Sequence, residues 1–459
     1  MRMYVCGVTV YDLCHIGHAR ANVAFDIIVR YLRHAGYEVR YVRNFTDIDD
    51  KIIRKANQEG IPFEAVSRKY IDAFYEDFDR MGLLRPDAEP KATEHIPEIV
   101  ALVSRLVRAG VAYAVDGDVY YAVKGFPAYG KLSGKNVEDL LSGARVEVDE
   151  RKQDPLDFAL WKASKPGEPA WDSPWGPGRP GWHIECSAMA MKHLGETFDI
   201  HGGGKDLVFP HHENEIAQSE AATGKPFARY WLHNGFVNID NEKMSKSLGN
   251  FFTLRDVLAR VSPEVLRFFF ASSHYRSPID YSDRSLAEAK AGLDRLYRVK
   301  EKAEGCRAAG ASPSAVPEGE EFSPLRDARK RFDEAMDDDF NTAAALGRLF
   351  DAVRALNRLA PAVPGADLPL AVQFLAGYGT VEPLFSVLGL LRLPSADYFH
   401  DAGAGDRVPE AEILARIEER RAARAAKDYG AADRIRKDLE AAGVILEDGK
   451  GGTTWKYLE

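Results

Sequence analysis

The sequence predicts an α/β protein, in which a split Rossmann-type domain with a parallel sheet is followed by an α-helical bundle and a small C-terminal α+β module. Two observations predict the sheet. Strand-like runs at residues 4–6 and 39–44 enclose helical periodicity at residues 23–32, which is the pattern of a βαβ unit. Strand-like runs at residues 198–200 and 230–232 then resume the sheet as a second half.

The bundle and the module are predicted from the rest of the pattern. Beyond residue 254, amphipathic helical runs follow one another almost without interruption. Residues 308–324, rich in Ala, Ser, Pro and Gly, predict a linker inside the bundle, and residues 402–409 predict a second boundary. Between the half-sheets, the Pro, Gly and Trp of residues 166–180 indicate an insertion. We therefore expect five segments: the first half of the Rossmann domain, 1–110; an inserted connective region, 111–180; the second half, 181–252; the helical bundle, 253–400; and the C-terminal module, 401–459.

Composition narrows the class of protein. The chain has 459 residues, 45% of them hydrophobic, which is enough for several cores. No apolar run approaches the roughly 18 to 20 residues that span a bilayer, and the start lacks a signal-peptide pattern. Only four cysteines occur, too few for a disulfide framework in a chain of this length. We therefore expect a cytoplasmic protein with reduced thiols and no membrane partner.

The net charge of −9 would argue against nucleic-acid binding only if the charge were evenly spread. It is not, because residues 413–437 hold eight Lys or Arg against four Asp or Glu. The basic residues of this stretch are Arg416, Arg420, Arg421, Arg424, Lys427, Arg434, Arg436 and Lys437. A solvated helix face is the alternative, since Glu418, Glu419 and Asp433 can pair with these charges locally.

Two short motifs, 224 residues apart, together indicate an ATP site. His15-Ile16-Gly17-His18 opens the first helical run, so both imidazoles are expected at a helix N-terminus, which favours phosphate. Gly17 lets a flat purine approach the backbone, and Lys246 of Lys243-Met244-Ser245-Lys246-Ser247 can bring a positive charge to the triphosphate. Each motif alone can arise by chance, and an N-terminal-turn histidine is more often a cap or surface residue. The two motifs in this order are a more specific indication of an ATP site than either motif alone.

These motifs resemble the HIGH and KMSKS signatures of class I aminoacyl-tRNA synthetases, and further segments resemble the cysteinyl-tRNA synthetase family. The segments are Tyr4-Val5-Cys6-Gly7, the run Asn44-Phe45-Thr46-Asp47-Ile48-Asp49-Asp50-Lys51, Gly181-Trp182-His183-Ile184-Glu185-Cys186, and the run from Phe198 through His201-Gly202-Gly203-Gly204 to His211-His212-Glu213-Asn214-Glu215. The resemblance covers nearly the whole chain. Members of the family usually have a leader before the first strand, whereas this chain begins almost on it, which leaves open how that edge of the sheet is covered.

The resemblance implies a reaction and its partners. ATP with Mg²⁺ would activate L-cysteine to cysteinyl-adenylate, and the cysteinyl group would pass to the 3′ end of tRNA(Cys). The bundle would then face the tRNA stem, and the C-terminal module would bind the anticodon. We expect a monomer rather than an oligomer.

Cys6, Cys186, His211 and Glu215 form a second candidate site, a zinc centre with sulfur, nitrogen and oxygen ligands. His211 and Glu215 stand at i and i+4, so a helix would place both on one face. The residues alone leave alternatives open: a buried cysteine is more often a small hydrophobe, the His211–Glu215 pair also suits a solvated helix start, and Cys14 is a ligand candidate by position. The resemblance selects Cys6 with the other three and implies one Zn²⁺ per chain.

Zinc would solve a selection problem, because an apolar pocket distinguishes the thiol of cysteine from the hydroxyl of serine poorly. Bonding between a thiolate and a borderline-soft metal distinguishes them well. No editing domain would then be needed, and the insertion at residues 111–180 is too short to be one.

The resemblance also implies roles for other residues. Gly7, Thr46 and Trp182 would contact the cysteine substrate, although Trp182 also suits plain core packing. His15, His18 and Lys246 would stabilise the phosphate in the transition state, and Lys243 would contribute less directly.

Asp206 would bind the adenylate together with Gly203 and Gly204, because a carboxylate accepts hydrogen bonds from both ribose hydroxyls. A triple glycine also suits a tight turn. The remaining histidines of these segments, which could equally contact ligand or not, are His183, His201, His212 and His233.

Three other functions share part of this pattern. A ligase that joins cysteine to an amino sugar in mycothiol synthesis would use the same ATP and zinc motifs but lacks a full anticodon-binding end. A non-catalytic RNA-binding paralogue would keep the fold without the intact motifs. A nucleotidyltransferase would share the phosphate-binding histidines without the metal set or the C-terminal helices.

Overall fold

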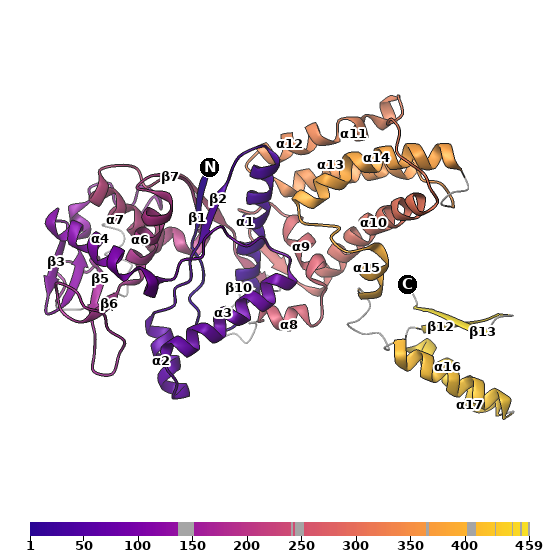
Figure 1. Cartoon of the computed structure of the whole chain (residues 1–459), viewed down its shortest axis with the longest axis horizontal. Coiled ribbons are helices and arrows are strands. Elements are labelled where there is room, and N and C mark those ends of the chain that lie inside the picture. The colour runs from indigo at the N-terminus through magenta and orange to yellow at the C-terminus, as the bar shows by residue number, and fades with distance from the viewer. Residues whose placement is uncertain are drawn as a thin grey trace.

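The structure is a computed structural model that describes residues 1–135, 151–239, 242–243, 252–363, 367–401, 410–426, 428–442, 444–449 and 452–457 (Figure 1). Among the described residues, no helix is long and apolar enough to span a membrane.

A parallel sheet of four strands confirms the predicted α/β class. Its order is β2 (Arg40–Arg43), β1 (Arg2–Val5), β7 (Phe198–Gly204) and β8 (Ala228–Asn234). Both halves of the chain therefore contribute to one sheet, as the split Rossmann prediction requires. Strand β1 lies between β2 and β7, so the expectation that the chain starts at an edge of the sheet is wrong.

The alternation of side chains along β1 divides the sheet into two packed faces. Met3 and Val5 join a buried cluster with Phe25 of α1 (Ile16–His34), on one face of the sheet. Tyr4 points the other way and joins a cluster with Met189 of α6 (Trp182–Leu194). Figure 1 shows α1 and α6 on opposite sides of the strands. One helix therefore covers each face of the sheet.

The remaining helices of the first half follow β2 in the chain. They are α2 (Asp50–Glu59), α3 (Phe63–Arg80), the short turn η1 (Ala92–His95) and α4 (Ile96–Arg108). In the second half, the short turns η3 (Lys205–Leu207) and η4 (Val208–His212) connect β7 to α7 (Glu213–Thr223).

An antiparallel sheet occupies the region where the sequence predicts an insertion. Its strands are β3 (Ala112–Val115), β4 (Asp118–Tyr121), β5 (Phe158–Ala163) and β6 (Gly178–Pro180), in that order. A short turn, η2 (Val123–Gly125), follows β4. Trp161 and Tyr121 of this sheet are buried in a core that the sheet shares with α4 and α6. The exact limits of the five predicted segments stay a prediction.

A small second sheet joins the end of the Rossmann half to the helices. Strand β9 (Val237–Ile239) pairs with β10 (Glu242–Lys243) on one side and with β11 (Ile279–Tyr281) on the other. Strand β11 interrupts the region that the sequence predicts to be helical. Its three residues are too few to produce a visible alternation of apolar side chains.

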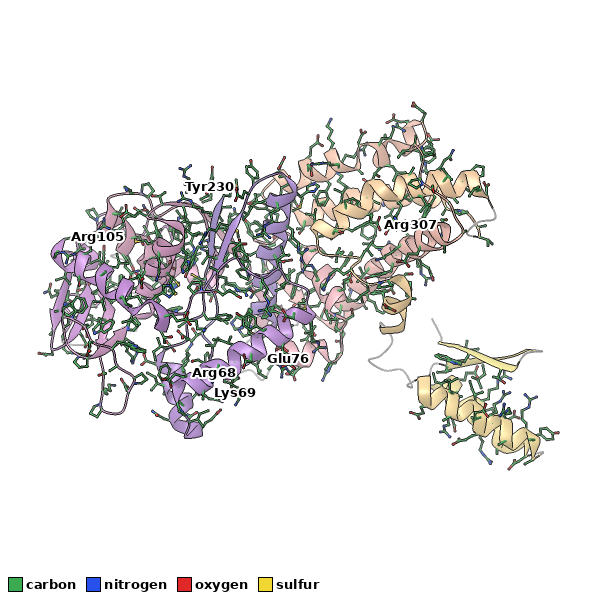
Figure 2. All side chains as sticks on the ribbon, in the orientation of Figure 1. Arg68, Lys69, Glu76, Arg105, Tyr230 and Arg307 are labelled. Atoms are coloured by element: carbon green, nitrogen blue, oxygen red, sulfur yellow. The ribbon has the colours of Figure 1, made fainter. Side chains whose placement is uncertain are left out.

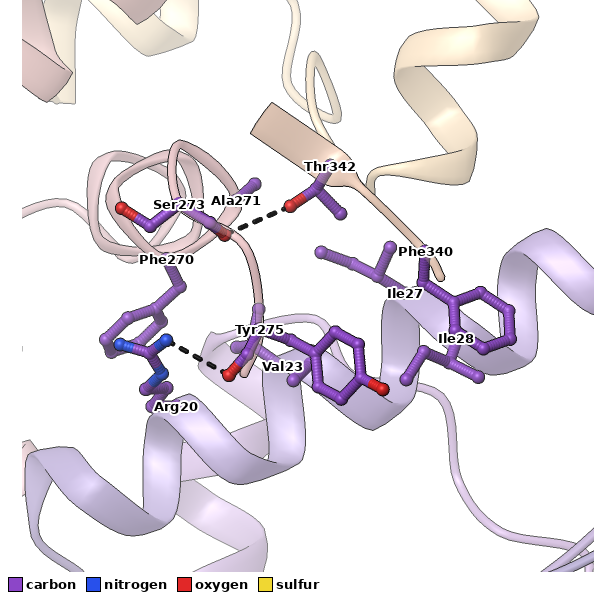
Figure 3. A pocket seen from close by; sticks show the side chains of 11 residues that line it. Arg20, Val23, Ile27, Ile28, Phe270, Ala271, Ser273, Tyr275, Phe340 and Thr342 are labelled. Atoms are coloured by element: carbon purple, nitrogen blue, oxygen red, sulfur yellow. Dashed lines mark hydrogen bonds between the residues drawn. The ribbon is translucent and has the colours of Figure 1, made fainter. Parts of the chain in front are cut away.

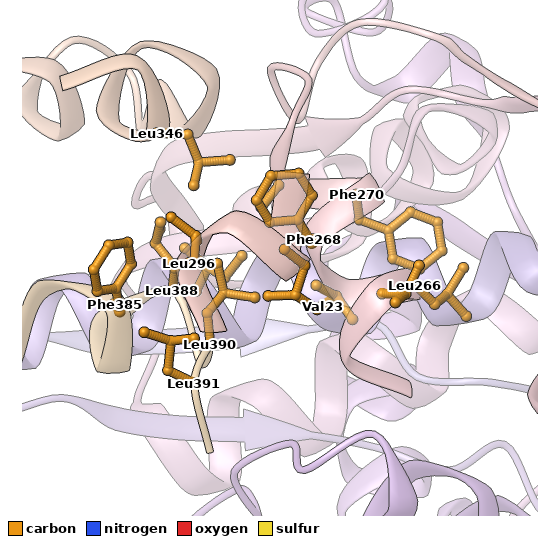
Figure 4. Close-up of a cluster of buried hydrophobic side chains, with 14 of the residues drawn as sticks. Val23, Leu266, Phe268, Phe270, Leu296, Leu346, Phe385, Leu388, Leu390 and Leu391 are labelled. Atoms are coloured by element: carbon orange, nitrogen blue, oxygen red, sulfur yellow. The ribbon is translucent and has the colours of Figure 1, made fainter. Parts of the chain in front are cut away.

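The helices between residues 252 and 401 pack around one large apolar core. They are α8 (Leu254–Leu258), α9 (Pro263–Ala271), α10 (Asp283–Ala308), η6 (Glu320–Phe322), α11 (Ser323–Arg326), α12 (Ala328–Asp337), α13 (Thr342–Leu359), α14 (Leu368–Val387) and α15 (Ser395–Asp401). Figure 4 shows Val23 of α1 beside Phe268, Leu296 and Leu388 in this core. The helix that begins with His15-Ile16-Gly17-His18 is thus packed against the bundle as well as the sheet.

The C-terminal residues form a small α+β unit. Helices α16 (Glu410–Ala425) and α17 (Tyr429–Ala441) pack with the hairpin of β12 (Val444–Gly449) and β13 (Gly452–Tyr457) around Ile413, Leu439 and Val444. Most of the predicted basic residues are exposed, but Arg420 is buried and lies 3.4 Å from the Thr453 hydroxyl. Lys427 lies outside the described residues.

Candidate metal and nucleotide site

The candidate site lies at the carboxyl ends of the parallel strands. Cys6 and Gly7 follow β1, Asn44 follows β2, and Asp206 follows β7. The backbone N–H of Cys6 donates to the Gly202 carbonyl at 3.0 Å, which continues the pairing of β1 and β7 past Val5. This edge is where open parallel sheets bind their ligands.

Gly7 allows two strand ends to approach each other closely. Its N–H donates to the Asn44 side-chain oxygen at 2.9 Å, and a Cβ at this position would lie 1.6 Å from the Asn44 carbonyl oxygen. No side chain fits there. The structure therefore assigns Gly7 a packing role beside the site, while its predicted contact with substrate stays a prediction.

The four predicted metal ligands come together. One donor atom from each of Cys6, Cys186, His211 and Glu215 lies within 4.8 Å of the others. The Cys6 and Cys186 sulfurs are 3.7 Å apart, Cys6 Sγ is 3.5 Å from Glu215 Oε1, and His211 Nε2 is 3.1 Å from the same oxygen. Four segments supply them, since Cys6 follows β1, Cys186 is on α6, His211 is on η4 and Glu215 is on α7.

A second set of donors overlaps the first. Cys6 and Glu215 also group with His201 and His212, again within 4.8 Å. His201 Nε2 is 2.8 Å from Glu215 Oε2, and His212 Nε2 is 3.3 Å from Cys6 Sγ. From the sequence alone, it is open whether His201 and His212 contact a ligand. Their convergence could not be read from spacing, because His201 ends up beside Glu215 only when β7 and α7 pack together.

Two further histidines, His183 and His233, orient the rings of His211 and His212. His183 Nδ1 lies 2.9 Å from His211 Nδ1, so His211 Nε2 is directed toward Glu215. His233 Nε2 lies 2.8 Å from His212 Nδ1, so His212 Nε2 is directed toward Cys6. Such partners behind a ligating imidazole fix its tautomer and orientation.

The protonation of these groups suits a metal site. Burial lowers the pKa of His211 and His212 well below the ordinary value, so both rings are neutral at pH 7 and can bind a metal. Burial raises the pKa of the Cys6 thiol, and the hydrogen bond with Cys186 raises it further. The hydrogen bond with Cys6 lowers the pKa of Cys186, but burial and the charge of Glu215 outweigh it and leave it raised. Crowded sulfur, nitrogen and carboxylate donors are the set that zinc accepts.

Cys14 belongs to neither donor group among the described residues. It is buried in the core shared with the helical bundle, and its carbonyl accepts from the N–H of Leu254 at 2.7 Å. Position in the sequence made it a candidate, but the fold gives it a packing role.

Trp182 contacts the donor group directly, and Thr46 contacts a neighbour of it. Trp182 is 38% exposed, and its ring stacks on His211 with centroids 4.2 Å apart. The alternative that it is plain core packing is therefore wrong. Thr46 is buried, and its side chain forms a hydrogen bond with Glu185, the residue before Cys186. Both positions suit contact with a small substrate bound at the donors, and that contact stays a prediction.

The two histidines of the first motif lie at the start of α1. His15 is the N-terminal cap: its Nδ1 accepts from the Gly17 N–H at 3.1 Å, and His18 Nδ1 accepts from the His15 N–H at 3.3 Å. The rings stack with centroids 3.6 Å apart. A neutral ring that accepts at Nδ1 has its hydrogen on Nε2, so each ring is a donor at that atom. The motif is thus both a helix cap and a pair of donors.

The three glycines are part of a strand, so the interpretation as a tight turn is wrong. Gly202, Gly203 and Gly204 end β7, and a Cβ on Gly202 would lie 2.4 Å from the Phe25 ring of α1. Asp206 follows in η3 and is exposed at the same edge of the sheet. Adenylate binding by Asp206, Gly203 and Gly204 stays a prediction.

Lys246 lies outside the described residues, and so does the side chain of Lys243, whose backbone belongs to β10. Their predicted roles rest on the sequence motif.

Comparisons with known proteins agree over the whole chain. Residues 1–291 match the family model of the class I (C) tRNA synthetase catalytic domain, residues 331–392 match the DALR domain, and residues 410–455 match the cysteinyl-tRNA ligase anticodon binding domain. A cysteine–tRNA ligase of Geobacter sulfurreducens is 58% identical, over 99% of this chain and 95% of that protein. A cysteine–tRNA ligase of Stutzerimonas stutzeri is 57% identical, over 100% and 95%.

A solved structure supports the fold alone. Methionyl-tRNA synthetase of Mycobacterium tuberculosis, in complex with methionyl-adenylate, superposes with a TM-score of 0.63 at 17% identity. The match covers 90% of this chain and 96% of that one.

Proposed function

Because this chain belongs to the cysteine–tRNA ligase family, we propose that it activates L-cysteine with ATP and transfers the cysteinyl group to tRNA(Cys). The observation that supports this most is the convergence of two thiols, an imidazole and a carboxylate at the edge of the sheet where the His15–His18 helix begins. We expect it to act as a monomer in the cytoplasm.

Cys6, Cys186, His211 and Glu215 would hold one zinc ion. This set has two sulfur donors, whereas the overlapping set with His201 and His212 has one. Because sulfur is a soft ligand, the set with two sulfur donors suits a metal that selects a thiol substrate better. When bound, zinc would coordinate the substrate thiol and lower its pKa. His183 would hold the His211 ring in its ligating orientation, and Trp182, stacked on that ring, would cover the substrate side chain.

The chain's own residues would then position and stabilise the reacting groups. The cysteine carboxylate attacks the α-phosphorus of ATP, an oxygen–phosphorus bond forms, and pyrophosphate leaves with Mg²⁺. No protein base is required. The Nε2–H groups of His15 and His18 would donate to the phosphate oxygens, and Lys246 would add a positive charge. Asp206 would accept from the ribose hydroxyls.

A pair of assays tests the proposal. The zinc-loaded chain should exchange pyrophosphate into ATP only when cysteine is present, and it should charge a tRNA(Cys) transcript. Cysteine-dependent exchange without charging, together with ligation of cysteine to an amino sugar, would favour the mycothiol ligase. The match of residues 410–455 to an anticodon binding domain argues against that alternative. Absence of cysteine-dependent exchange would overturn the proposal and favour a binding paralogue or another nucleotidyltransferase.

A further inference from the structure

The turn of residues 274–277 joins α9 to β11 and lies between the Rossmann domain and the helical bundle. Arg20 of α1 holds it from one side: its Nη2 donates to the carbonyls of His274 at 3.3 Å, Tyr275 at 3.2 Å and Ser277. Arg20 is 2% exposed (Figure 3). Burial lowers its pKa to about 10, so the guanidinium is still charged at pH 7.

The bundle holds the same turn from the other side. Asp339, between α12 and α13, accepts from Arg276 Nε, from Arg276 Nη2 at 2.9 Å and from the Tyr275 hydroxyl at 2.9 Å. The Thr342 hydroxyl donates to the Ser273 carbonyl at 3.2 Å, as the dashed line in Figure 3 shows. A paired guanidinium–carboxylate contact of this kind fixes orientation as well as distance.

The backbone that presents Asp339 is held in an unfavourable conformation. Asp339 and the next residue, Phe340, have φ of 53° and 55°, in the left-handed region that residues other than glycine rarely adopt. The Phe340 ring meets the Tyr275 ring edge-on, with centroids 6.4 Å apart. Strain of this kind persists only where surrounding contacts fix the chain, and here those contacts converge on the turn.

The 274–277 turn also sets the position of the strands β9 and β10. The Gly235 N–H, just before β9, donates to the Tyr275 carbonyl at 2.8 Å, and a Cβ on Gly235 would lie 2.3 Å from the Ser277 carbonyl oxygen. Strand β11 pairs with β9, and β9 pairs with β10. Strand β10 ends at Lys243, three positions before Lys246 in the sequence.

A small cavity lies beside the turn. Its volume is about 10 Å³, and it is lined by Arg20, Val23, Ile27, Phe270, Tyr275 and Phe340 (Figure 3). That is about the space of one water molecule. The turn is held beside this cavity by the polar contacts of Arg20 and Asp339.

We propose that Asp339 and Arg20 are positioning residues, which clamp the 274–277 turn between the bundle and α1 and so align β9 and β10 with the His15–His18 helix. The inference rests on the proposed function. It makes a residue of the helical bundle a determinant of the rate of adenylate formation, although it touches no substrate.

Asp339→Asn tests the clamp with little change to the backbone, since Asn also tolerates positive φ. A matched control is Glu382→Gln, which removes a comparable pair within the bundle. Arg307 donates to Glu382 through Nη1 at 3.3 Å and Nη2 at 2.8 Å (Figure 2 labels Arg307). The side chains are 47% and 39% exposed there, against 49% and 38% for Arg276 and Asp339.

Single-turnover adenylate formation, measured by rapid quench, should be roughly ten- to a hundredfold slower in Asp339→Asn, the size expected when reacting groups are misaligned by a distant change. The KM for cysteine and the melting temperature should match those of Glu382→Gln, whose rate should equal that of the unchanged chain. Arg276→Gln should reproduce the loss from the other side of the pair. Equal rates in Asp339→Asn, Arg276→Gln and Glu382→Gln would overturn the clamp. Failure of the unchanged chain to form adenylate would overturn the proposed function instead.

Discussion

Cys6 and Cys14 are both poor thiolates on their own, because burial raises the pKa of each thiol. What separates them is their neighbours. Cys6 faces a second thiol, a carboxylate and imidazoles within a few ångströms, whereas Cys14 is packed among apolar side chains. A bound metal can therefore offset the free-energy cost of deprotonating the thiol at Cys6 but not at Cys14.

Substitution of the two cysteines should therefore affect zinc binding differently. Cys6→Ser should lose zinc, and Cys14→Ser should keep about one zinc per chain, because serine is a poor replacement for a thiolate ligand. Elemental analysis of purified, dialysed protein measures both. Loss of zinc in Cys14→Ser with retention in Cys6→Ser would show that the donor group is not the metal site.

His18 supports a second prediction at the same scale. His18→Ala removes a ring whose Nδ1 is fixed by the His15 N–H and whose Nε2–H is free to donate. Adenylate formation should slow by about a hundredfold, the usual loss for one preorganised donor, and Lys246→Ala should do the same. The KM for cysteine should change much less. Rapid-quench kinetics check this, with His34→Ala at the far end of the same helix as the control; an unchanged rate in His18→Ala would remove that ring from catalysis.

Strand β7 depends on close packing against α1. Gly202→Ala would force a methyl group into the Phe25 ring of α1 and should destabilise the fold by about 1–3 kcal/mol. Gly347 in α13 is the control, because a Cβ there meets nothing within 4 Å. Gly347→Ala should stabilise the fold by about 0.5–1 kcal/mol. Urea unfolding measures both, and equal midpoints would contradict the packing argument.

The same strand shows why some elements could be predicted from the sequence and others could not. The strands around α1 have an apolar pattern that can be read locally, and the helix start at His15 has a local signal in its cap. The tight turn, which the sequence allows as an alternative for the glycines of β7, is wrong, and the reason for Gly202 could not be read locally because it is the Phe25 ring on α1. The four donors Cys6, Cys186, His211 and Glu215 could be selected from the sequence only through a family resemblance. That His201 and His212 join Cys6 and Glu215 becomes visible only in the folded structure.

At the scale of the molecule, the C-terminal unit has its own core and follows a segment outside the described residues. Removing residues from 402 onward should therefore leave cysteine-dependent exchange largely intact. It should raise the KM for tRNA and erase discrimination against a mutated anticodon, because the exposed basic residues of α16 and α17 would be lost. Charging kinetics with both tRNAs measure this. Full efficiency and full anticodon preference after truncation would show that recognition lies elsewhere.

A metal held by Cys6, Cys186, His211 and Glu215 would select the thiol of the substrate over the hydroxyl of serine. Pyrophosphate exchange by the zinc-loaded chain, run with cysteine and then with serine at the same concentration, measures this selection. Cysteine should support exchange and serine should be slower by roughly 10⁴-fold, the discrimination available when a site pairs with a group that the competitor lacks. Comparable exchange with serine would show that the metal does not select the thiol.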